Sequence, residues 1–183
     1  DVVITGGCQA HTPPQLMMIF CQLGALTRGN IRPFDVGASG TLLGEGAGML
    51  VLKKLSQAER DNDRIYAVLR GLGTSSDGKA KGLLAPRMEG EILALKRAYT
   101  SCDIDPATLG LIEAHGTGIA LGDKTEIQSL SSLFGARSSE ADLPRTGIGS
   151  VKSMISHCIP AAGAAAMIKT ALALHHKVLP PTL

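Results

Sequence analysis

The chain has 183 residues, with 18 Lys and Arg against 16 Asp and Glu, a formal net charge of +2. Hydrophobic residues make up 44% and charged residues 19%, a ratio typical of globular domains and unlike that of disordered chains. The small net charge, the absence of Trp and the 3% of aromatic residues make nucleic acid an unexpected partner. The apolar stretch 161–174 is interrupted by Lys169 and is too short to span a bilayer, so we expect no membrane span.

Strand-like and helix-like segments alternate from the start of the chain. β-branched residues closed by glycines predict a buried strand over residues 1–7. Thr12 as N-cap and Pro13 as the first helical residue then predict a helix that ends near residue 26. An ordered glycine-rich loop, a strand, a short surface helix and a second strand follow, over residues 29–48, 47–53, 56–64 and 65–72.

The second half of the sequence repeats this alternation after a candidate boundary at residues 73–86, which lack hydrophobic periodicity. Strands are predicted at residues 110–114 and 147–151, and helices at 88–99, 123–134 and 160–176; a polar loop reaches about residue 143. The alternation predicts an α/β fold with mainly parallel sheets layered with helices. The alanine-rich face of the last helix predicts a buried, closely packed helix.

Two histidines occupy similar places in the predicted fold. His115 lies at the end of a predicted strand in Glu-Ala-His-Gly-Thr-Gly, and His157 follows another strand just before the last helix. Ligands bind at the carboxyl ends of strands in open α/β sheets, and a helix N-terminus disfavours a protonated imidazole. Alternatively, each histidine is only hydrogen-bonded in a turn or packed at a helix start. Their matching positions favour a functional pair.

Other candidate residues have structural interpretations. Lys152 can be a solvated charge at a strand end. Asp123 and Glu126 have the spacing of a capping box, which by itself favours a helix cap over catalysis for Glu126. The four cysteines show no metal-binding spacing, so we expect reduced thiols in a cytoplasmic protein. A nucleotide-binding module is the least supported class, because the near P-loop that ends at Lys79 continues with Ala80 and lacks the Mg²⁺-binding hydroxyl.

A set of motifs in order gives the sequence a family resemblance. They are Arg-Pro-Phe-Asp at 32–35, Gly-Glu-Gly-Ala-Gly at 44–48, the His115 motif with Gly-Asp at 122–123, residues 149–153 with His157, Ala-Ala-Gly at 161–163 and Leu-Pro-Pro-Thr at 179–182. Together they resemble a β-ketoacyl synthase (ketosynthase) domain of the thiolase superfamily, of the polyketide or polyunsaturated-fatty-acid type. The resemblance implies a partial thiolase-like fold, with residues 1–84 from the first half and 85–183 from the second.

The resemblance also implies an activity and a set of site residues. The family performs decarboxylative Claisen condensation of an acyl thioester with malonyl-acyl carrier protein. His115 and His157 would surround the reacting oxygen, Lys152 would support them, and Glu126 would interact with the lysine. Thr117 would bind the phosphopantetheine arm. Ile119 replaces a second threonine of the family at this arm.

Further expectations concern partners and the nucleophile. The resemblance implies an acyl carrier protein, which supplies the phosphopantetheine, together with acyl and malonyl thioesters and a homodimer when intact; it implies no metal or redox cofactor. The nucleophilic Cys of the family precedes residues 1–7, so we expect it outside this chain and expect the segment alone to be inactive. The alternative is a non-catalytic partner of the chain-length-factor type. Retention of both histidines and Lys152 favours the enzyme.

Overall fold

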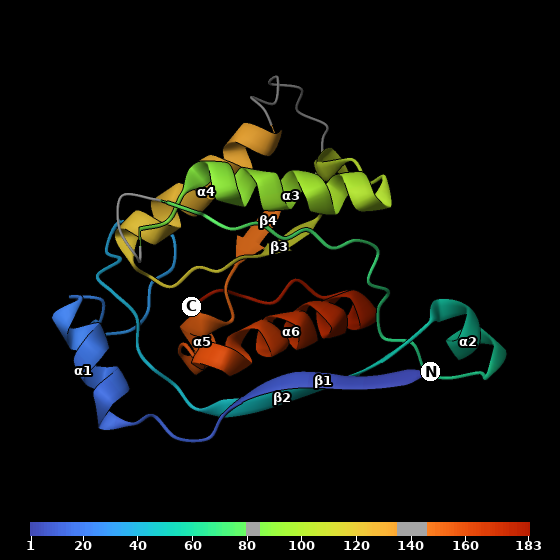
Figure 1. The fold of residues 1–183 in the computed structure, drawn as a ribbon, viewed down its shortest axis with the longest axis horizontal. Helices are drawn as coiled ribbons and strands as arrows, with labels where there is room; N and C mark the ends of the chain where they lie inside the picture. The colour runs from blue at the N-terminus through green and yellow to red at the C-terminus, as the bar shows by residue number, and fades with distance from the viewer. Residues whose placement is uncertain (80–84, 135–145) are drawn as a thin grey trace.

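The computed structural model describes residues 1–79, 85–134 and 146–183. Figure 1 shows four layers: a two-stranded sheet, a central helix, a second two-stranded sheet and a pair of helices. In that order they are β1 (Val2–Gln9) with β2 (Gly46–Lys53), α6 (Ala162–His176), β3 (Leu111–Glu113) with β4 (Gly147–Gly149), and α3 (Met88–Cys102) with α4 (Ala120–Phe134). The shorter elements are α1 (Pro14–Gln22), α2 (Leu55–Arg60), η1 (Pro106–Thr108), α5 (Lys152–Ile155) and η2 (Ile159–Ala161).

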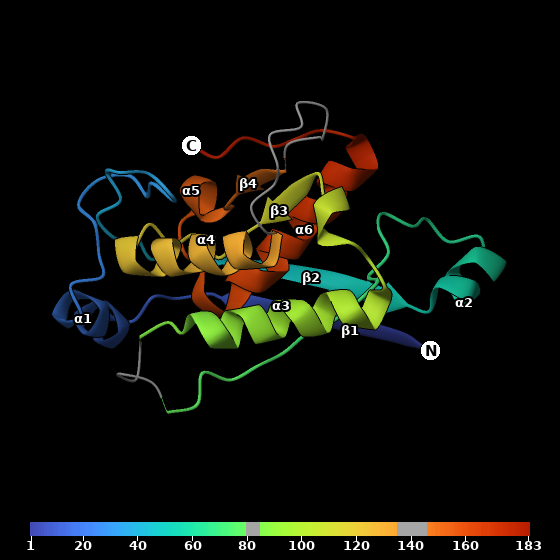
Figure 2. The ribbon, with the colours of Figure 1, turned by 90° about the horizontal axis from the view of Figure 1, so that it is seen from above.

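The two sheets differ in direction. β3 and β4 are parallel, as predicted, but β1 and β2 are antiparallel, with Ile4 opposite Val51. The prediction of mainly parallel sheets is therefore wrong for the first sheet. A parallel pair needs a connection that crosses over the sheet, whereas α1 and the loop after it lie beyond one end of this sheet (Figures 1 and 2).

Helix α6 packs on β1 and β2 through small residues. A Cβ atom added to Gly48 of β2 would lie 3.1 Å from the Ala164 Cβ atom, and one added to Gly7 of β1 would collide with the Pro160 carbonyl oxygen. Ala162 and Ala164 are buried, whereas His175 at the far end of α6 is exposed. The predicted close packing of an alanine-rich helix is therefore confirmed over its first turn.

Several predicted boundaries of the first half change. Strand 1–7 exists but is exposed rather than buried: Ile4 is 69% exposed, and Val3, on the opposite face, is 55% exposed. Helix α1 has Pro13, not Thr12, at its N-cap, and ends before Gly24, whose φ is +62°. Within the described part of the chain, residues 65–72 pair with no strand. They run instead toward α3, where the Leu72 amide donates to the Ser101 hydroxyl.

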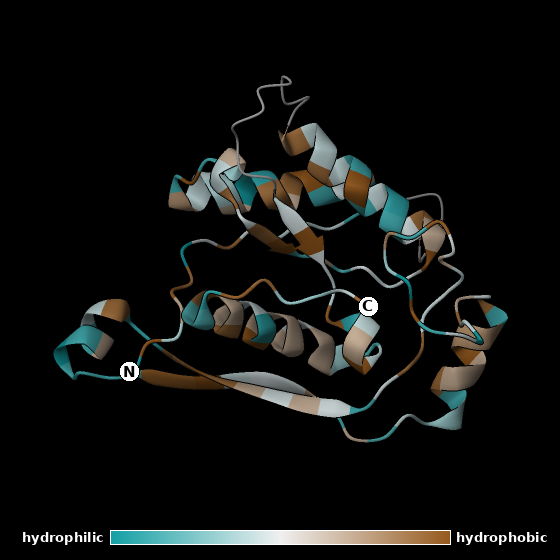
Figure 3. Cartoon of the chain, turned by 180° about the vertical axis from the view of Figure 1, so that it is seen from behind, coloured by the Kyte–Doolittle hydropathy of each residue, from teal (hydrophilic) through white to brown (hydrophobic). Residues whose placement is uncertain are grey.

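The remaining predicted elements are confirmed with shifted ends. Strand β2, helix α2 and helix α3 occupy the predicted segments, and α4 begins three residues early, at Ala120. The predicted polar loop lies outside the described residues, as do residues 80–84 of the candidate boundary. Apolar residues run along β1 and β2 and along the inner strands β3 and β4 (Figure 3). Among the described helices, none is long and apolar enough to cross a membrane.

Candidate active site

The structure brings the two predicted histidines together. His115 follows β3, and His157 follows the short helix α5. Their ring centroids lie 5.6 Å apart, with the ring planes at 85°. The parallel pairing of β3 with β4 produces this arrangement, because both chain segments leave the same edge of the sheet.

Backbone contacts fix the position of His157 and the proton on its ring. Its amide donates to the Leu42 carbonyl at 2.8 Å, and its carbonyl accepts from the Gly44 amide at 3.1 Å. The Ile159 amide donates to Nδ1 of His157 at 3.2 Å. Because Nδ1 accepts this hydrogen bond, the neutral ring carries its proton on Nε2, which is left to donate.

The side chain of Lys152 contacts the backbone of His115. The Lys152 residue is only 3% exposed, so its interpretation as a solvated strand-end charge is wrong. Its Nζ atom donates to the His115 carbonyl at 2.6 Å, and the Ser150 hydroxyl donates to the same oxygen at 3.2 Å. The lysine therefore holds the backbone of the histidine rather than its ring.

Glu126 holds the other side of the same backbone. Its two carboxylate oxygens accept from the amides of His115, at 2.6 Å, and Gly116, at 2.9 Å. The capping-box interpretation is wrong, because α4 begins at Ala120 and the Asp123 amide donates to the Ile119 carbonyl inside the helix. Glu126 and Lys152 thus fix the amide and the carbonyl of His115, respectively.

Asp123 is a site residue for which the sequence indicated only a helix cap. Its buried carboxylate accepts from the amides of Phe34, Thr117 and Gly118, at 2.9, 3.1 and 3.2 Å. It therefore ties the loop at 32–35 to the loop after His115. An acid placed one turn inside a helix that follows a glycine-rich loop is the sequence signal for this role, but it looks the same as a cap.

The charges of the site favour neutral histidines. Burial, then the Lys152 and His115 charges, lower the pKa of His157 from 6.5 to about 4. Burial and the Lys152 charge also lower the pKa of His115. Burial lowers the pKa of Lys152 itself, against the opposing effects of the Glu126 and Glu113 carboxylates. The site therefore presents two uncharged imidazoles beside a lysine.

The two residues predicted at the phosphopantetheine arm lie on the loop after His115. Thr117 is buried, and its hydroxyl oxygen accepts from the Ile119 amide at 3.3 Å, which leaves the hydroxyl proton free to donate. Ile119 is half-buried and presents an apolar side chain. Gly116 has φ +43°, and a Cβ atom there would lie 2.6 Å from the Ser150 Cβ atom, so this turn requires glycine.

A buried ion pair under the site was not predicted. It joins Glu113, the last residue of β3, to Lys169 of α6, and the distance between Glu113 Oε2 and Lys169 Nζ is 2.7 Å. The other carboxylate oxygen of Glu113 accepts from the Val151 amide, just before Lys152. In the sequence, Lys169 stands out only as an interruption of an apolar stretch, because its partner lies on a distant strand.

The cysteines are free thiols in the structure. Cys158 adjoins His157, but its Sγ atom is buried and donates toward the Ile155 carbonyl at 3.5 Å. Burial raises the pKa of this thiol, which disfavours the nucleophilic thiolate. Among the described residues, no group of His, Cys, Asp and Glu side chains is arranged to hold a metal ion.

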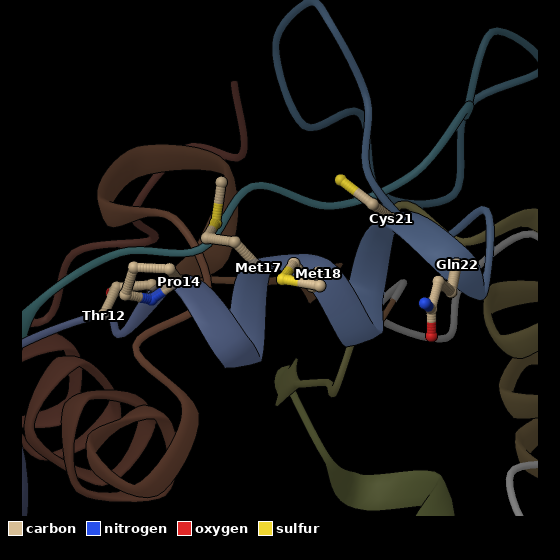
Figure 4. Close-up of a pocket in the computed structure, with 6 residues that line it drawn as sticks. All are labelled: Thr12, Pro14, Met17, Met18, Cys21 and Gln22. Carbon is tan, nitrogen blue, oxygen red and sulfur yellow. The ribbon is translucent and has the colours of Figure 1, made fainter.

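A separate groove lies along α1 (Figure 4). It has a volume of about 520 Å³ and is lined by Thr12, Pro14, Met17, Met18, Cys21 and Gln22. Figure 4 shows both methionines and the cysteine projecting from the helix. These residues all come from one short stretch of chain, so the groove is distinct from the convergence of loops at the two histidines.

Comparison with known protein families shows to which family the chain belongs. Residues 66–183 match the family described as "Beta-ketoacyl synthase, C-terminal domain", and residues 1–58 match its N-terminal domain. The chain belongs to the β-ketoacyl synthase family. Its fold is accordingly thiolase-like, as the sequence motifs predicted. The predicted division at residues 84 and 85 stays a prediction.

The similar proteins are large synthases. This ketosynthase chain is 42% identical to a polyunsaturated fatty acid synthase of Thraustochytrium sp., over all of this chain and 6% of that protein. It is 41% identical to a phenolphthiocerol/phthiocerol polyketide synthase of Mycobacterium tuberculosis, over 98% of this chain and 10% of that protein. The chain thus spans a small fraction of these relatives.

Solved ketosynthase structures share the fold of this chain over its whole length. The ketosynthase from module 6 of the bacillaene synthase of Bacillus subtilis superimposes with a TM-score of 0.93 at 39% identity, over all of this chain and 33% of that one. The ishigamide ketosynthase/chain length factor gives a TM-score of 0.88 at 36% identity, over all of this chain and 43% of that one. The chain therefore spans about a third to two fifths of such domains.

Proposed function

We propose that this chain is part of a ketosynthase that extends acyl chains by decarboxylative Claisen condensation. The observation that supports this most directly is the pair of neutral imidazoles of His115 and His157, whose ring centroids lie 5.6 Å apart. Two uncharged N–H donors that converge on one point can stabilise an oxygen that becomes negative during the reaction. The match to the family supports the same chemistry.

The proposed reaction has two steps. The malonyl thioester loses CO₂, and the electron pair of the broken C–C bond forms an enolate whose oxygen accepts hydrogen bonds from the two histidines. The enolate carbon then attacks the carbonyl carbon of an acyl thioester held on a cysteine. The C–S bond breaks, the cysteine sulfur leaves as a thiolate, and the extended β-ketoacyl chain remains on the carrier thiol. Neutral histidines can take part in this step because each keeps one ring N–H that donates a hydrogen bond to the enolate oxygen.

The neighbouring residues have supporting roles in this proposal. Lys152 and Glu126 hold the carbonyl and the amide of His115, which fixes the direction of its ring. The Thr117 hydroxyl donates to the phosphopantetheine arm, and Ile119 gives the arm an apolar contact. Asp123 keeps the loop that carries Thr117 against Phe34.

The proposed partners are an acyl carrier protein, which brings the phosphopantetheine, and acyl and malonyl thioesters. The relatives' names, a polyunsaturated fatty acid synthase and a polyketide synthase, support chain extension as the setting. The nucleophilic cysteine is proposed to come from outside these 183 residues, since Cys158, beside His157, is buried with a raised pKa. A homodimer of the intact protein also stays a proposal.

A non-catalytic role remains the second candidate, because one similar structure is a ketosynthase/chain length factor. Such a partner has no chemical need for two neutral histidines held over a buried lysine. The two candidates differ in one measurable property, the release of CO₂ from a malonyl thioester.

The test uses the full-length synthase that contains this segment. CO₂ release and condensation are measured with malonyl-acyl carrier protein in the parent and in a His157→Ala variant. We expect a fall of about 10²–10³-fold in the variant, the usual effect of removing one oxyanion donor. His11→Ala, at an exposed histidine on the approach to α1, serves as the control and keeps the parent rate. A parent that releases no CO₂, or a variant with the parent's rate, would refute the proposed function.

A further inference from the structure

Glu113 and Lys169 form the most buried ion pair among the described residues. Their side chains are 5% and 10% exposed, whereas Lys53 in the pair with Asp61 is 20% exposed and Asp61 39%. Burying two charges is costly, and a buried pair is often no more stable than apolar residues of the same size. Stability alone is therefore a weak reason for this pair, and the contacts of its carboxylate suggest another.

The carboxylate of Glu113 contacts the turn that presents Lys152. Oε2 faces Lys169, and Oε1 accepts from the Val151 amide. Val151 is the N-cap residue of the one-turn helix α5, which begins at Lys152. The ion pair therefore fixes one carboxylate oxygen so that the other anchors the backbone immediately before the lysine.

Lys152 in turn reaches the backbone of His115. Its Nζ atom donates to the His115 carbonyl, and the negative charge of Glu113 favours the charged form of the lysine and so raises its pKa. A continuous path of contacts thus joins α6 to the histidine: Lys169 to Glu113, Glu113 to the Val151 amide, and Lys152 to His115.

We propose that Glu113 and Lys169 are positioning residues of the ketosynthase site, which hold the α5 turn so that Lys152 supports His115. This inference rests on the proposed function for its activity test. Lys169 also passes close to Gly149 of β4, where an added Cβ atom would lie 3.6 Å from Nζ. Lys169 of α6 thus contacts β3 through Glu113 and lies near β4 at Gly149, in keeping with the place of α6 between the two sheets in Figure 1.

The test uses three variants of the full-length synthase: Glu113→Gln, Lys169→Met and the double variant. Each single variant leaves one buried charge without its partner and so lowers stability, whereas the double variant removes both charges and regains it. We expect kcat for condensation to stay about 10-fold to 10²-fold below the parent in the double variant, the scale of an angstrom-sized misplacement. Lys169→Arg, which keeps the charge, is expected to retain most of the activity.

The pH profile separates positioning from mere stability. Burial lowers the pKa of Lys152, against the smaller raising effects of the Glu126, Glu113, Asp123 and Cys158 charges. Without the Glu113 charge, Lys152 loses its proton at lower pH, so the alkaline limb of kcat/KM moves to lower pH in Glu113→Gln and in the double variant. Lys53→Met is the matched control: it breaks the more exposed ion pairs of Lys53 with Asp61 and Asp63, which are distant in sequence from the site, and keeps the parent profile. Parent kcat and an unshifted alkaline limb in the stable double variant would overturn the inference.

A readout without catalysis keeps the two proposals distinguishable. Amide hydrogen exchange at residues 150–156 is expected to be faster in the double variant than in the parent. Exchange in the sheet of β1 and β2 is expected to stay unchanged. If the parent synthase does not condense, the proposed function fails and this exchange alone decides the positioning role. If the parent condenses and both kinetics and exchange of the double variant match it, only the positioning role fails.

Discussion

His157 illustrates at the scale of one residue how surroundings choose a chemical form. Its pKa falls from 6.5 to about 4, first because of burial and then because of the Lys152 and His115 charges. The folded protein therefore binds fewer protons than the unfolded chain between these two values. The stability that the neutral ring contributes is fully present above pH 6.5 and is lost as the pH falls toward 4.

This linkage predicts that the free energy of unfolding depends on pH. In the intact ketosynthase domain, the free energy of unfolding is expected to fall as the pH is lowered from 6.5 toward 4. His157→Asn keeps an acceptor for the Ile159 amide but cannot titrate, so its slope over this range is expected to be shallower. Urea unfolding at several pH values measures both. Equal slopes in parent and variant would contradict the neutral assignment.

Ser156 is strained beside the same histidine. Its φ of +63° and ψ of 179° lie in a region that only glycine adopts readily. Ser156→Gly is therefore expected to raise the free energy of unfolding by about 1 kcal/mol. Ser153→Gly is the matched control, because the Ser153 hydroxyl donates to the Ser150 carbonyl and accepts from the Leu183 amide. The control is expected to lose about 1 kcal/mol, and urea midpoints that move together would contradict the assignment of strain.

Packing at the scale of elements depends on small residues where the first sheet meets η2 and α6. Gly7 has no room for a side chain, since an added Cβ atom would meet the Pro160 carbonyl, which is part of the backbone and cannot rotate away. Gly163, on the exposed side of α6, has nothing within 4 Å of an added Cβ atom. The two glycines therefore predict opposite effects of the same substitution.

Gly7→Ala is expected to lower the free energy of unfolding by about 1–3 kcal/mol through overpacking. Gly163→Ala is expected to raise it by about 0.5–1 kcal/mol, because alanine loses less entropy than glycine in a helix. Chemical denaturation of the intact domain compares the two. A stable Gly7→Ala variant would mean that β1 and η2 do not approach as closely as the structure shows.

At the scale of the whole molecule, one face of the first sheet is left uncovered by the described residues. Ile4 and Val51, directly paired across the strands, are 69% and 70% exposed, and Val2 and Met49 beside them are 57% and 61% exposed. Contiguous exposed apolar residues on a sheet favour association. The part of the first sheet nearest the N-terminus is brown, and so hydrophobic, in Figure 3.

Expressed by itself, the chain is therefore expected to self-associate through this face. The double variant Ile4→Thr and Val51→Thr keeps β-branched residues and is expected to reduce association. Val36→Thr is the control, because Val36 is fully exposed on a loop away from the sheet. Sedimentation velocity of the three proteins measures the effect. A monomeric parent chain would contradict this prediction.

The sequence by itself determined the order and type of most elements and the family. Motifs of fixed spacing indicated the candidates His115, His157, Lys152, Glu126 and Thr117. These motifs can be found in the sequence because each consists of residues that are close together in the chain. The structure then placed the first four of these within one connected set of contacts. Their catalytic roles stay predictions.

Only the tertiary structure decided which partners each charge has. Asp123 and Glu126 look like a helix cap in sequence, yet their carboxylates bind amides of other loops. Lys169 looks like a break in an apolar helix until it meets Glu113, 56 positions earlier in the chain. The prediction of parallel sheets was wrong for β1 and β2, because a strand carries the same residue pattern in either direction. Contacts between residues far apart in the sequence depend on how the sheets and helices pack, and a local sequence pattern does not predict that packing.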